Sequence, residues 1–291
     1  MKSLTAYILF FIMSLSAYAQ NLTDEIRNIV LNKKATIGVA VLYKSKVHTL
    51  CNDNKYPLMS VFKFHIAVTA LKKMERENIA LDSMVYIKPE QMHINTYSPL
   101  RDKYPNQKIH ISYREIIEYT ITVSDNNTCD WLIDFIGGIK IVDSYIKSIG
   151  VRELNLTETE DSMHEDIMRS YNNWSTPLAV VELLRKIYVE DILTKEHFVF
   201  LENAMLHCFS GKDKLIAGLP KNIKFAHKTG HSDRTDKGVQ ISDADAGIIY
   251  MPDGEKCYVA VIIKDSKESD ETNAKIMSDI SNVIYNCLMS D

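Results

Sequence analysis

The spacing of apolar and polar residues predicts strands near both ends of the chain and helices between them. Residues 22–32 (LTDEIRNIVLN) have the pattern of an amphipathic helix, and a second helix is predicted over residues 270–288. Short turns, K-S-K and P-D-G, join the first two and the last two strands. The predicted strands span residues 36–43, 47–51, 224–230, 244–251 and 257–265.

The middle of the chain is predicted to be helical, and several of its helices start at a Ser or Thr that can cap the first turn. We therefore expect an α/β protein of the α+β type, with an antiparallel five-stranded sheet and flanking helices formed by both chain ends (20–55 and 206–291). An all-helical domain (56–205) would be inserted between them, and a cleft between two such domains often binds a small molecule. The helices predicted for the insertion span residues 60–77, 112–123, 128–136, 140–149, 175–189 and 194–207.

Composition narrows the class of protein. The 291 residues are 46% hydrophobic and 25% charged, which is ordinary for a globular protein and excludes a disordered, collagen-like or multi-span membrane protein. The formal net charge of −4 gives no electrostatic signal for nucleic acid. We therefore expect no nucleic-acid partner.

The first nineteen residues have the features of a secretory leader. Lys2 supplies a positive start, residues 6–13 (AYILFFIM) form a short apolar stretch, and A-Y-A at 17–19 is a cleavage site of the small-x-small type. We expect cleavage after Ala19, export to the periplasm and no membrane anchor afterwards. An uncleaved N-terminal anchor is the alternative.

The five cysteines do not indicate a disulfide framework or a zinc site, because their number is odd and no C-x-x-C pair occurs. Buried thiols are the favoured interpretation, although an exported chain could form one bridge. His227 and His231 have a spacing that could suit a metal, but no cluster of His, Cys or Asp accompanies them. We therefore expect neither a metal nor another cofactor.

The stretch S-V-F-K at 60–63 is a candidate nucleophile site. Ser60 would lie at the N-terminal end of a helix, where backbone N–H groups are free, and Lys63 one turn later shares its face. A lysine in so apolar a stretch needs a partner or loses its proton, and either state could assist attack by the serine. The alternative is a simple helix cap with a lysine that reaches water. Ser144 and Lys147 have the same spacing, among polar neighbours.

Two further motifs could place polar groups at the same cleft. S-D-N at 124–126 follows a predicted helix, where a hydroxyl and an amide can face a cavity. K-T-G at 228–230 lies on a predicted strand, where it offers a positive charge, a hydroxyl and close backbone approach. Each motif alone could equally be a polar turn or an exposed strand end.

The three motifs together, in the order S-x-x-K, S-D-N and K-T-G, resemble those of the penicillin-recognising serine enzymes. The resemblance covers essentially the whole mature chain and includes the order of strands and helices. It implies the fold shared by serine β-lactamases and D,D-peptidases, with a β-lactam as the small-molecule substrate. A monomer is the expected state.

The segment 155–164 (NLTETEDSMH) is polar and aperiodic, which predicts a loop. It resembles the omega loop of class A β-lactamases, with Glu160 at the position of the general base and Glu158 as the competitor. His164 stands where the family usually has Asn, and a branch of the family that leans towards cephalosporins looks similar here. Tyr97, in Y-S-P, resembles the tyrosine that flanks the family's cleft.

The resemblance implies a mechanism in two steps. Ser60 would attack the β-lactam carbonyl, with Lys63 or Glu160 as the acceptor of its proton, and Ser124 would pass a proton to the leaving nitrogen. Glu160 would then activate water to hydrolyse the acyl-enzyme. Backbone N–H groups of Ser60 and His231 would bind the oxyanion. The residues expected to bind the substrate are Asn126, Lys228, Thr229, Gly230, His231 and Tyr97.

Two other functions remain open at the level of sequence. A penicillin-binding D,D-peptidase would share the first step and stay acylated, because it lacks the carboxylate of the second step. A non-hydrolytic β-lactam receptor would also bind one equivalent, and it would need a signalling segment in a membrane. Repeated turnover of substrate distinguishes the lactamase from both.

Overall fold

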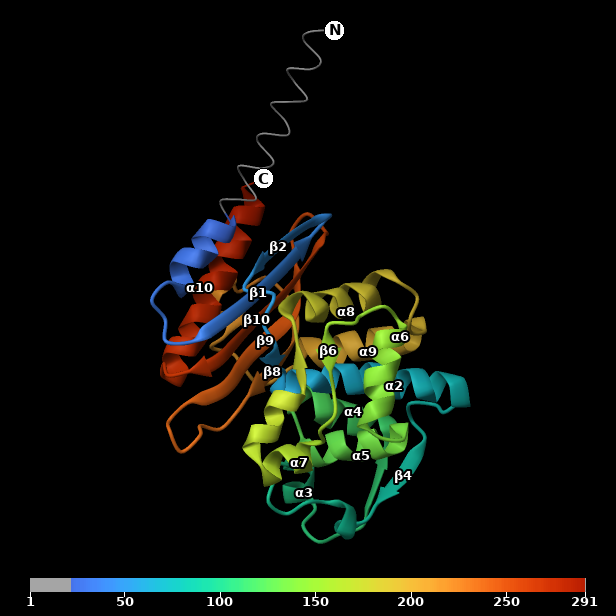
Figure 1. Cartoon of the computed structure of the whole chain (residues 1–291). Helices are drawn as coiled ribbons and strands as arrows, with labels where there is room; N and C mark the ends of the chain where they lie inside the picture. Colours follow the sequence, from blue (N-terminus) through green and yellow to red (C-terminus); the bar gives the residue numbers. More distant parts are fainter. Residues whose placement is uncertain (1–21, 291) are drawn as a thin grey trace, which may run out of the picture.

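The computed structural model describes residues 22–290, and the predicted leader with its cleavage site lies outside them. The polypeptide forms a sheet from both chain ends and a mainly helical part from the middle, side by side (Figure 1). The predicted α+β fold with an antiparallel five-stranded sheet is confirmed. Among the described residues, no helix has the length and apolar character needed to cross a membrane.

The large sheet has the strand order β2-β1-β10-β9-β8, and all its pairs are antiparallel. Alternate side chains point to opposite faces, as the period of a strand requires. In β10, for example, Val261 contacts the apolar cluster on one face, whereas Ile262 contacts the cluster on the other. The strands are β1 (Thr36–Tyr43), β2 (Lys46–Leu50), β8 (Phe225–His231), β9 (Gln240–Tyr250) and β10 (Lys256–Ser266).

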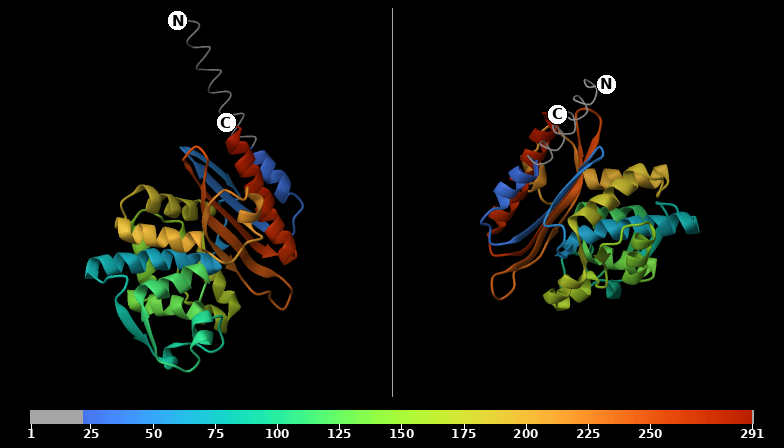
Figure 2. Two further views of the ribbon diagram at one scale, coloured as in Figure 1. Left: turned by 180° about the vertical axis from the view of Figure 1, so that it is seen from behind. Right: turned by 45° about the horizontal axis from the view of Figure 1, so that its top comes forward.

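One face of this sheet is covered by α10 (Asp270–Met289) and by the helix at residues 22–30, and the other faces the helical part (Figure 2). Ser269 caps α10 by accepting a hydrogen bond from the Thr272 N–H. The short turn η4 (Leu215–Gly218) packs tightly on α10: a Cβ on Gly218 would lie 1.9 Å from the Ser278 carbonyl oxygen.

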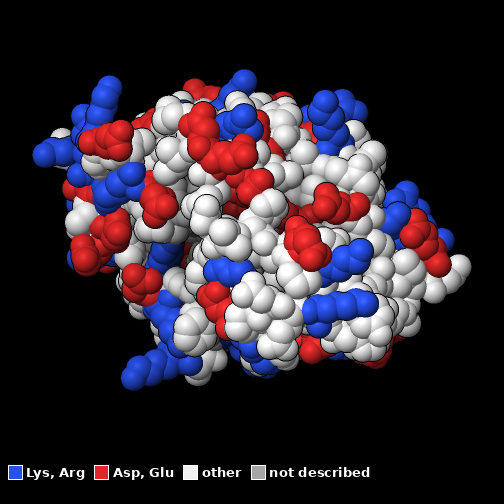
Figure 3. All heavy atoms as spheres, turned by 90° about the horizontal axis from the view of Figure 1, so that it is seen from below, with Lys and Arg blue, Asp and Glu red and all other residues white. Residues whose placement is uncertain are grey.

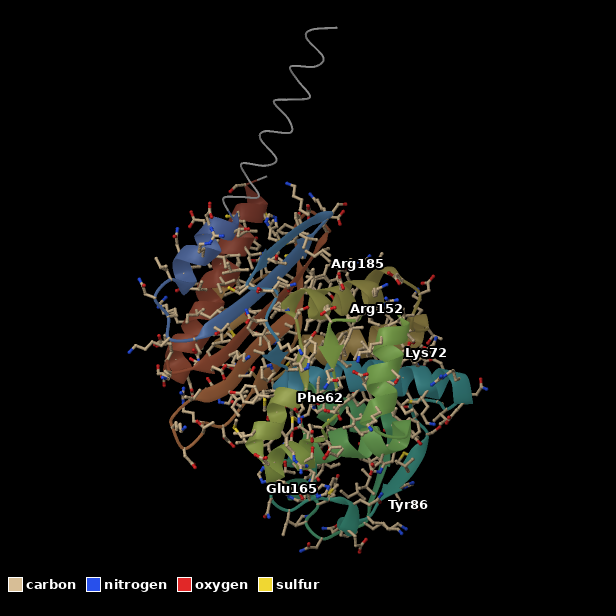
Figure 4. The ribbon with its side chains drawn as sticks, in the orientation of Figure 1. Phe62, Lys72, Tyr86, Arg152, Glu165 and Arg185 are labelled. Atoms are coloured by element: carbon tan, nitrogen blue, oxygen red, sulfur yellow. The ribbon has the colours of Figure 1, made fainter. Side chains whose placement is uncertain are left out.

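The helical part is built around α2 (Phe62–Glu77), whose residues from 62 to 71 are all buried. Of the Ser and Thr residues predicted to start helices, Ser112 and Thr194 are caps, whereas Thr176 rather than Ser175 caps α8. Asp125 rather than Thr128 caps α5, and Ser60 lies in a 3₁₀ turn before α2 without capping it. Figure 4 shows Phe62 at the end of α2 nearest the sheet, so the start of this helix lies at the junction of the two parts. The other helices are α3 (Pro99–Lys103), α4 (Tyr113–Thr122), α5 (Asn126–Ile136), α6 (Ile139–Ser148), α7 (Glu160–Glu165), α8 (Pro177–Val189) and α9 (Lys195–Leu206).

The inserted part is not purely helical. It contains a two-stranded sheet of β4 (Met84–Ile87) with β5 (Ile109–Ser112), and a three-stranded one in the order β3-β7-β6 (Tyr56–Pro57, Trp174–Ser175 and Leu154–Asn155). Strands of two to four residues are too short to leave a periodic signal in the sequence. One apolar cluster runs without a break from α2 to the inner face of the sheet. The domain boundaries predicted at residues 56 and 205 therefore stay a prediction.

The predicted loop after residue 155 also contains regular structure. Thr159 and Ser162 form reciprocal caps at the start of α7, and the turn η3 (Ile167–Asn172) follows. The sequence T-E-D-S places Thr159 and Ser162 three residues apart, which is the spacing of a capping box. Such a local pair can start a helix in a segment without periodic apolar residues. Glu160 is consequently the first residue of a helix and not part of an irregular loop.

The five cysteines form no disulfide within the described part of the chain. Cys129 and Cys257 are buried thiols, as expected, whereas Cys51 is exposed. Lys, Arg, Asp and Glu side chains are interspersed over the face in Figure 3, in agreement with the near balance of charges in the sequence.

Candidate active site

A cleft of about 580 Å³ lies where the sheet and the helical part meet, as the predicted arrangement suggested. Its walls come from the turn before α2, the segment before α3, the region of α7 and η3, and the end of β8. The residues at its surface that were singled out in the sequence are Ser60, Tyr97, Ser124, Asn126, Glu160, His164, Thr229 and His231. Lys63, Lys228 and Gly230, which were also singled out, do not line it.

Ser60 lies in a single 3₁₀ turn, η1 (Met59–Val61), immediately before α2. Met59 precedes it with φ at 43°, a left-handed conformation that is costly for a residue with a Cβ and is characteristic of functional sites. The strand β8 approaches this turn closely, because a Cβ on Gly230 would lie 2.5 Å from the Leu58 carbonyl oxygen and 3.1 Å from the Ser60 nitrogen. Glycine is therefore required at position 230 on steric grounds.

Lys63 is fully buried, which contradicts the alternative that it reaches water. Its Nζ lies 2.9 Å from Glu160 Oε1 and donates hydrogen bonds to the Ser124 carbonyl oxygen (2.7 Å) and to Asn126 Oδ1 (2.6 Å). A buried ammonium needs such partners to offset its lost hydration. Of these three partners, Ser124 and Asn126 belong to the S-D-N motif, and Glu160 belongs to the segment 155–164.

Glu160 connects the lysine with the serine. Its Oε1 accepts a hydrogen bond from Ser60 Oγ at 3.4 Å and is the same atom that faces Lys63. The competitor Glu158 does not line the cleft: its carboxylate accepts hydrogen bonds from Ser162 Oγ (2.7 Å) and Asn172 Nδ2 (2.9 Å). Of the two glutamates, Glu160 alone can reach the serine.

Asp130, on α5, holds the first residues of α7 in place and was not recognised in the sequence. Its carboxylate accepts backbone N–H hydrogen bonds from Glu160 and Asp161, each at 2.8 Å. Burial, followed by the neighbouring Glu160 charge, raises the pKa of Asp130 from 3.8 to about 7. The sequence offers only a weak signal, an acid on a helix whose neighbours Cys129 and Leu132 are apolar and buried.

Ser124 lies between the two lysines of the motifs. Its Oγ accepts hydrogen bonds from Lys228 Nζ at 2.9 Å and from Lys63 Nζ at 3.3 Å, and its own backbone is left-handed, with φ at 60°. Lys228 is almost fully buried, and burial lowers its pKa from 10.5 to about 8. Ser124 is therefore a hydroxyl in an electropositive corner of the cleft.

The strand β8 carries the remaining polar groups of this side. The Thr229 hydroxyl hydrogen-bonds to the Ser210 hydroxyl, which also lines the cleft and which no motif had indicated. His231 is half exposed, and its Nδ1 lies 3.3 Å from Asp243 Oδ1. His227 instead points away into a buried pair with Asp245, at 2.8 Å. No group of three potential metal ligands occurs in residues 22–290.

Another wall consists of residues 94–97 and of part of α7. Residues 93–97 are called here the wall segment. Tyr97 is 60% exposed on this wall, and His164 is exposed on α7. His93 of the wall segment and Asp161 of α7 connect these two parts, with His93 Nδ1 and Asp161 Oδ1 3.0 Å apart. Figure 4 shows Glu165, the last residue of α7, on the same side of the helical part as the start of α2.

The second S-x-x-K pair lies elsewhere. Lys147 Nζ binds its neighbour Asp143 at 2.7 Å, one helical turn away, and Ser144 is exposed. Neither residue lines the cleft. The same short motif therefore occurs once at the cleft and once as an ordinary helix surface.

Comparison with known proteins agrees with this geometry. Residues 21–288 match the model of the β-lactamase enzyme family. A β-lactamase of Bacteroides uniformis is 44% identical over 269 residues, covering 92% of this chain and 91% of its own. The extended-spectrum β-lactamase PER-1 of Pseudomonas aeruginosa is 32% identical over 272 residues, covering 93% and 88%.

A solved structure supports the same assignment. A class A β-lactamase from Bacteroides cellulosilyticus superposes with a TM-score of 0.92 at 44% identity, covering 94% of this chain and 99% of its own. The chain belongs to the β-lactamase enzyme family, and within it to class A.

Proposed function

We propose that this enzyme hydrolyses penicillins and cephalosporins through an acyl-enzyme on Ser60, which water activated by Glu160 then releases. The observation that carries the proposal is the position of Glu160 Oε1, 3.4 Å from Ser60 Oγ and 2.9 Å from Lys63 Nζ. A carboxylate within reach of the acylated oxygen is what a deacylating base requires, and it distinguishes a hydrolase from a permanently acylated peptidase or receptor.

In the first step, Ser60 attacks the lactam carbonyl while its proton passes to Glu160, with which it is hydrogen-bonded, or to Lys63. Backbone N–H groups of Ser60 and His231 receive the developing negative charge, each contributing on the order of 3 kcal/mol. The tight approach of Gly230 to the Ser60 nitrogen supports this pairing.

The substrate carboxylate is bound by the electropositive end of the cleft. The hydroxyls of Ser124 and Thr229 line the cleft there, and Lys228, buried behind them, donates hydrogen bonds to Ser124 Oγ and to the Thr229 carbonyl oxygen. Ser124, hydrogen-bonded to both lysines, relays a proton to the departing lactam nitrogen in this proposal. Asn126, held at the other side of Lys63, faces the cleft and contacts the side-chain amide of the substrate. Tyr97 packs beside that side chain.

The range of substrates includes cephalosporins in this proposal. His164 lines the cleft where most of the family carries Asn, and PER-1, whose name describes an extended spectrum, is a relative. A monomer exported to the periplasm by a leader at residues 1–19 is the expected form.

The proposal is tested by Glu160→Ala, with Glu158→Ala as the matched control. We expect the Glu160 variant to accumulate a covalent penicilloyl adduct, seen by intact-protein mass spectrometry, while its turnover falls by at least about 100-fold. Glu158→Ala should turn over within a few fold of the parent, and Ser60→Ala should form no adduct.

Release of product by Glu160→Ala at the parental rate would contradict the assignment. One equivalent of adduct without turnover in the parent itself would instead favour a D,D-peptidase or a receptor. Steady-state kinetics with one penicillin and one cephalosporin, measured side by side, test the substrate range.

A further inference from the structure

The carboxamide of Asn126 is hydrogen-bonded on both sides. Its Oδ1 accepts from Lys63 Nζ at 2.6 Å, and its Nδ2 donates to Thr96 Oγ1 at 2.7 Å. An amide that flipped by about 180° would point its NH₂ group at the ammonium and its oxygen at the hydroxyl. The hydroxyl of Thr96 could pair with either end of the amide, so it is the ammonium of Lys63, a donor only, that selects the orientation with an oxygen towards it. In that orientation Thr96 Oγ1 accepts from Nδ2 and restrains the carboxamide from rotating, and one N–H of Nδ2 is left for a ligand in the cleft.

Thr96 is itself held firmly. It is 9% exposed, and its carbonyl oxygen accepts a hydrogen bond from Arg101 Nη1 at 2.7 Å. The same nitrogen lies 2.8 Å from the His93 carbonyl oxygen and 2.9 Å from that of Ile94. One nitrogen of the Arg101 guanidinium thus binds three carbonyl oxygens of the wall segment.

The wall segment is also fastened to the S-D-N turn from which Asn126 projects. The Asn126 N–H donates to the Tyr97 carbonyl oxygen at 3.0 Å. Ser98 Oγ and the Leu100 N–H both donate to the carboxylate of Asp125, at 2.9 Å and 2.8 Å from Oδ2. The hydroxyl of Thr96 and the amide of Asn126 are therefore fixed relative to each other by backbone as well as side-chain contacts.

We propose that Thr96 is a positioning residue for β-lactam hydrolysis, and that it acts by holding the Asn126 carboxamide in the orientation that serves both Lys63 and the substrate. The proposal rests on the function proposed above. Arg101 supports it from the far side by fixing the backbone of Thr96. Neither residue belongs to any of the motifs considered in the sequence.

The test is a double-mutant cycle between positions 96 and 126, followed by kcat/KM for a penicillin with an acylamino side chain. Thr96→Val keeps the shape and removes the acceptor, so we expect a loss of about tenfold in kcat/KM, whereas Thr96→Ser should recover to within about twofold of the parent. In an Asn126→Ala background, Thr96→Val should cause less than about a twofold further loss, because the group on which it acts is gone.

A tenfold loss from Thr96→Val that persists in the Asn126→Ala background would overturn the proposal, since Thr96 would then act independently. Unchanged kinetics of Thr96→Val would also overturn it. Thermal melting of each variant separates loss of fold from loss of positioning, and Thr96→Ala provides a second removal of the hydroxyl. If the parent itself does not turn over penicillin, the function proposed above fails, whereas parental turnover with additive variants contradicts only the role of Thr96.

Discussion

Replacement of Asp130 by an asparagine should remove a pH-dependent term from the stability of the enzyme. The carboxyl of Asp130 is partly buried under α7, and its pKa is raised from 3.8 to about 7. Between these two values the folded protein keeps a proton that the unfolded chain has already released. The free energy of unfolding therefore falls as the pH rises through this range.

The size of this term follows from the shift of the pKa. The rise of the Asp130 pKa from 3.8 to about 7 changes the free energy of unfolding by about 4 kcal/mol between low and high pH, because one pKa unit is about 1.36 kcal/mol. Between about pH 5.5 and pH 8, which is a practical range for a folded enzyme, the linkage relation leaves about 2 kcal/mol. The amide introduced by Asp130→Asn does not titrate, so the difference in stability between parent and variant should change by that amount.

The measurement is urea denaturation of parent and variant at both pH values, with two-state behaviour checked by two probes. We expect the parent to lose about 2 kcal/mol relative to Asp130→Asn on going from about pH 5.5 to pH 8. Asp134→Asn is the matched control, because Asp134 lies exposed on the same helix. A pH-independent difference between parent and Asp130→Asn would refute the reasoning, and so would the same change in the control.

Two further predictions concern the strand β8. Because burial lowers the pKa of Lys228 to about 8, kcat/KM for a penicillin should fall as the pH rises above 8. Lys228→Arg stays charged and should show no such fall up to about pH 9.5. An identical fall of kcat/KM at alkaline pH in both proteins would count against the role of Lys228. Gly230→Ala should lower kcat/KM by about 100-fold, because its Cβ would displace the turn that carries Ser60; parental activity would show that the turn can yield at no cost.

Much of the fold could be predicted because the large elements have strong periodic signals. The strands predicted at 224–230 and 257–265 correspond to β8 and β10, displaced or extended by one residue at their ends. The long helix predicted from residue 270 starts where Ser269 caps it. Such elements bury one face or one stripe against a large core, and this requirement is visible in any single sequence.

The parts that the sequence did not reveal are held by polar contacts between distant residues. The capping of α7 depends on neighbours three residues apart, but its placement depends on Asp130, thirty residues earlier in the chain. Likewise, the contact between Ser210 and Thr229 joins a loop residue to β8, and the two residues share no motif. Hydrogen bonds of this kind leave no period in the sequence, because each one needs a single polar residue at a position that only the folded chain defines.

The same contrast explains why short motifs at the cleft are informative in combination and weak alone. Ser60 and Lys63 have the same spacing as Ser144 and Lys147, yet only the first lysine is buried. Local spacing fixes which side chains share a helix face, but it does not determine whether a distant carboxylate lies opposite that face. Glu160 provides it here, one hundred residues later, so the chemistry of the pair is set by the tertiary fold and not by the motif.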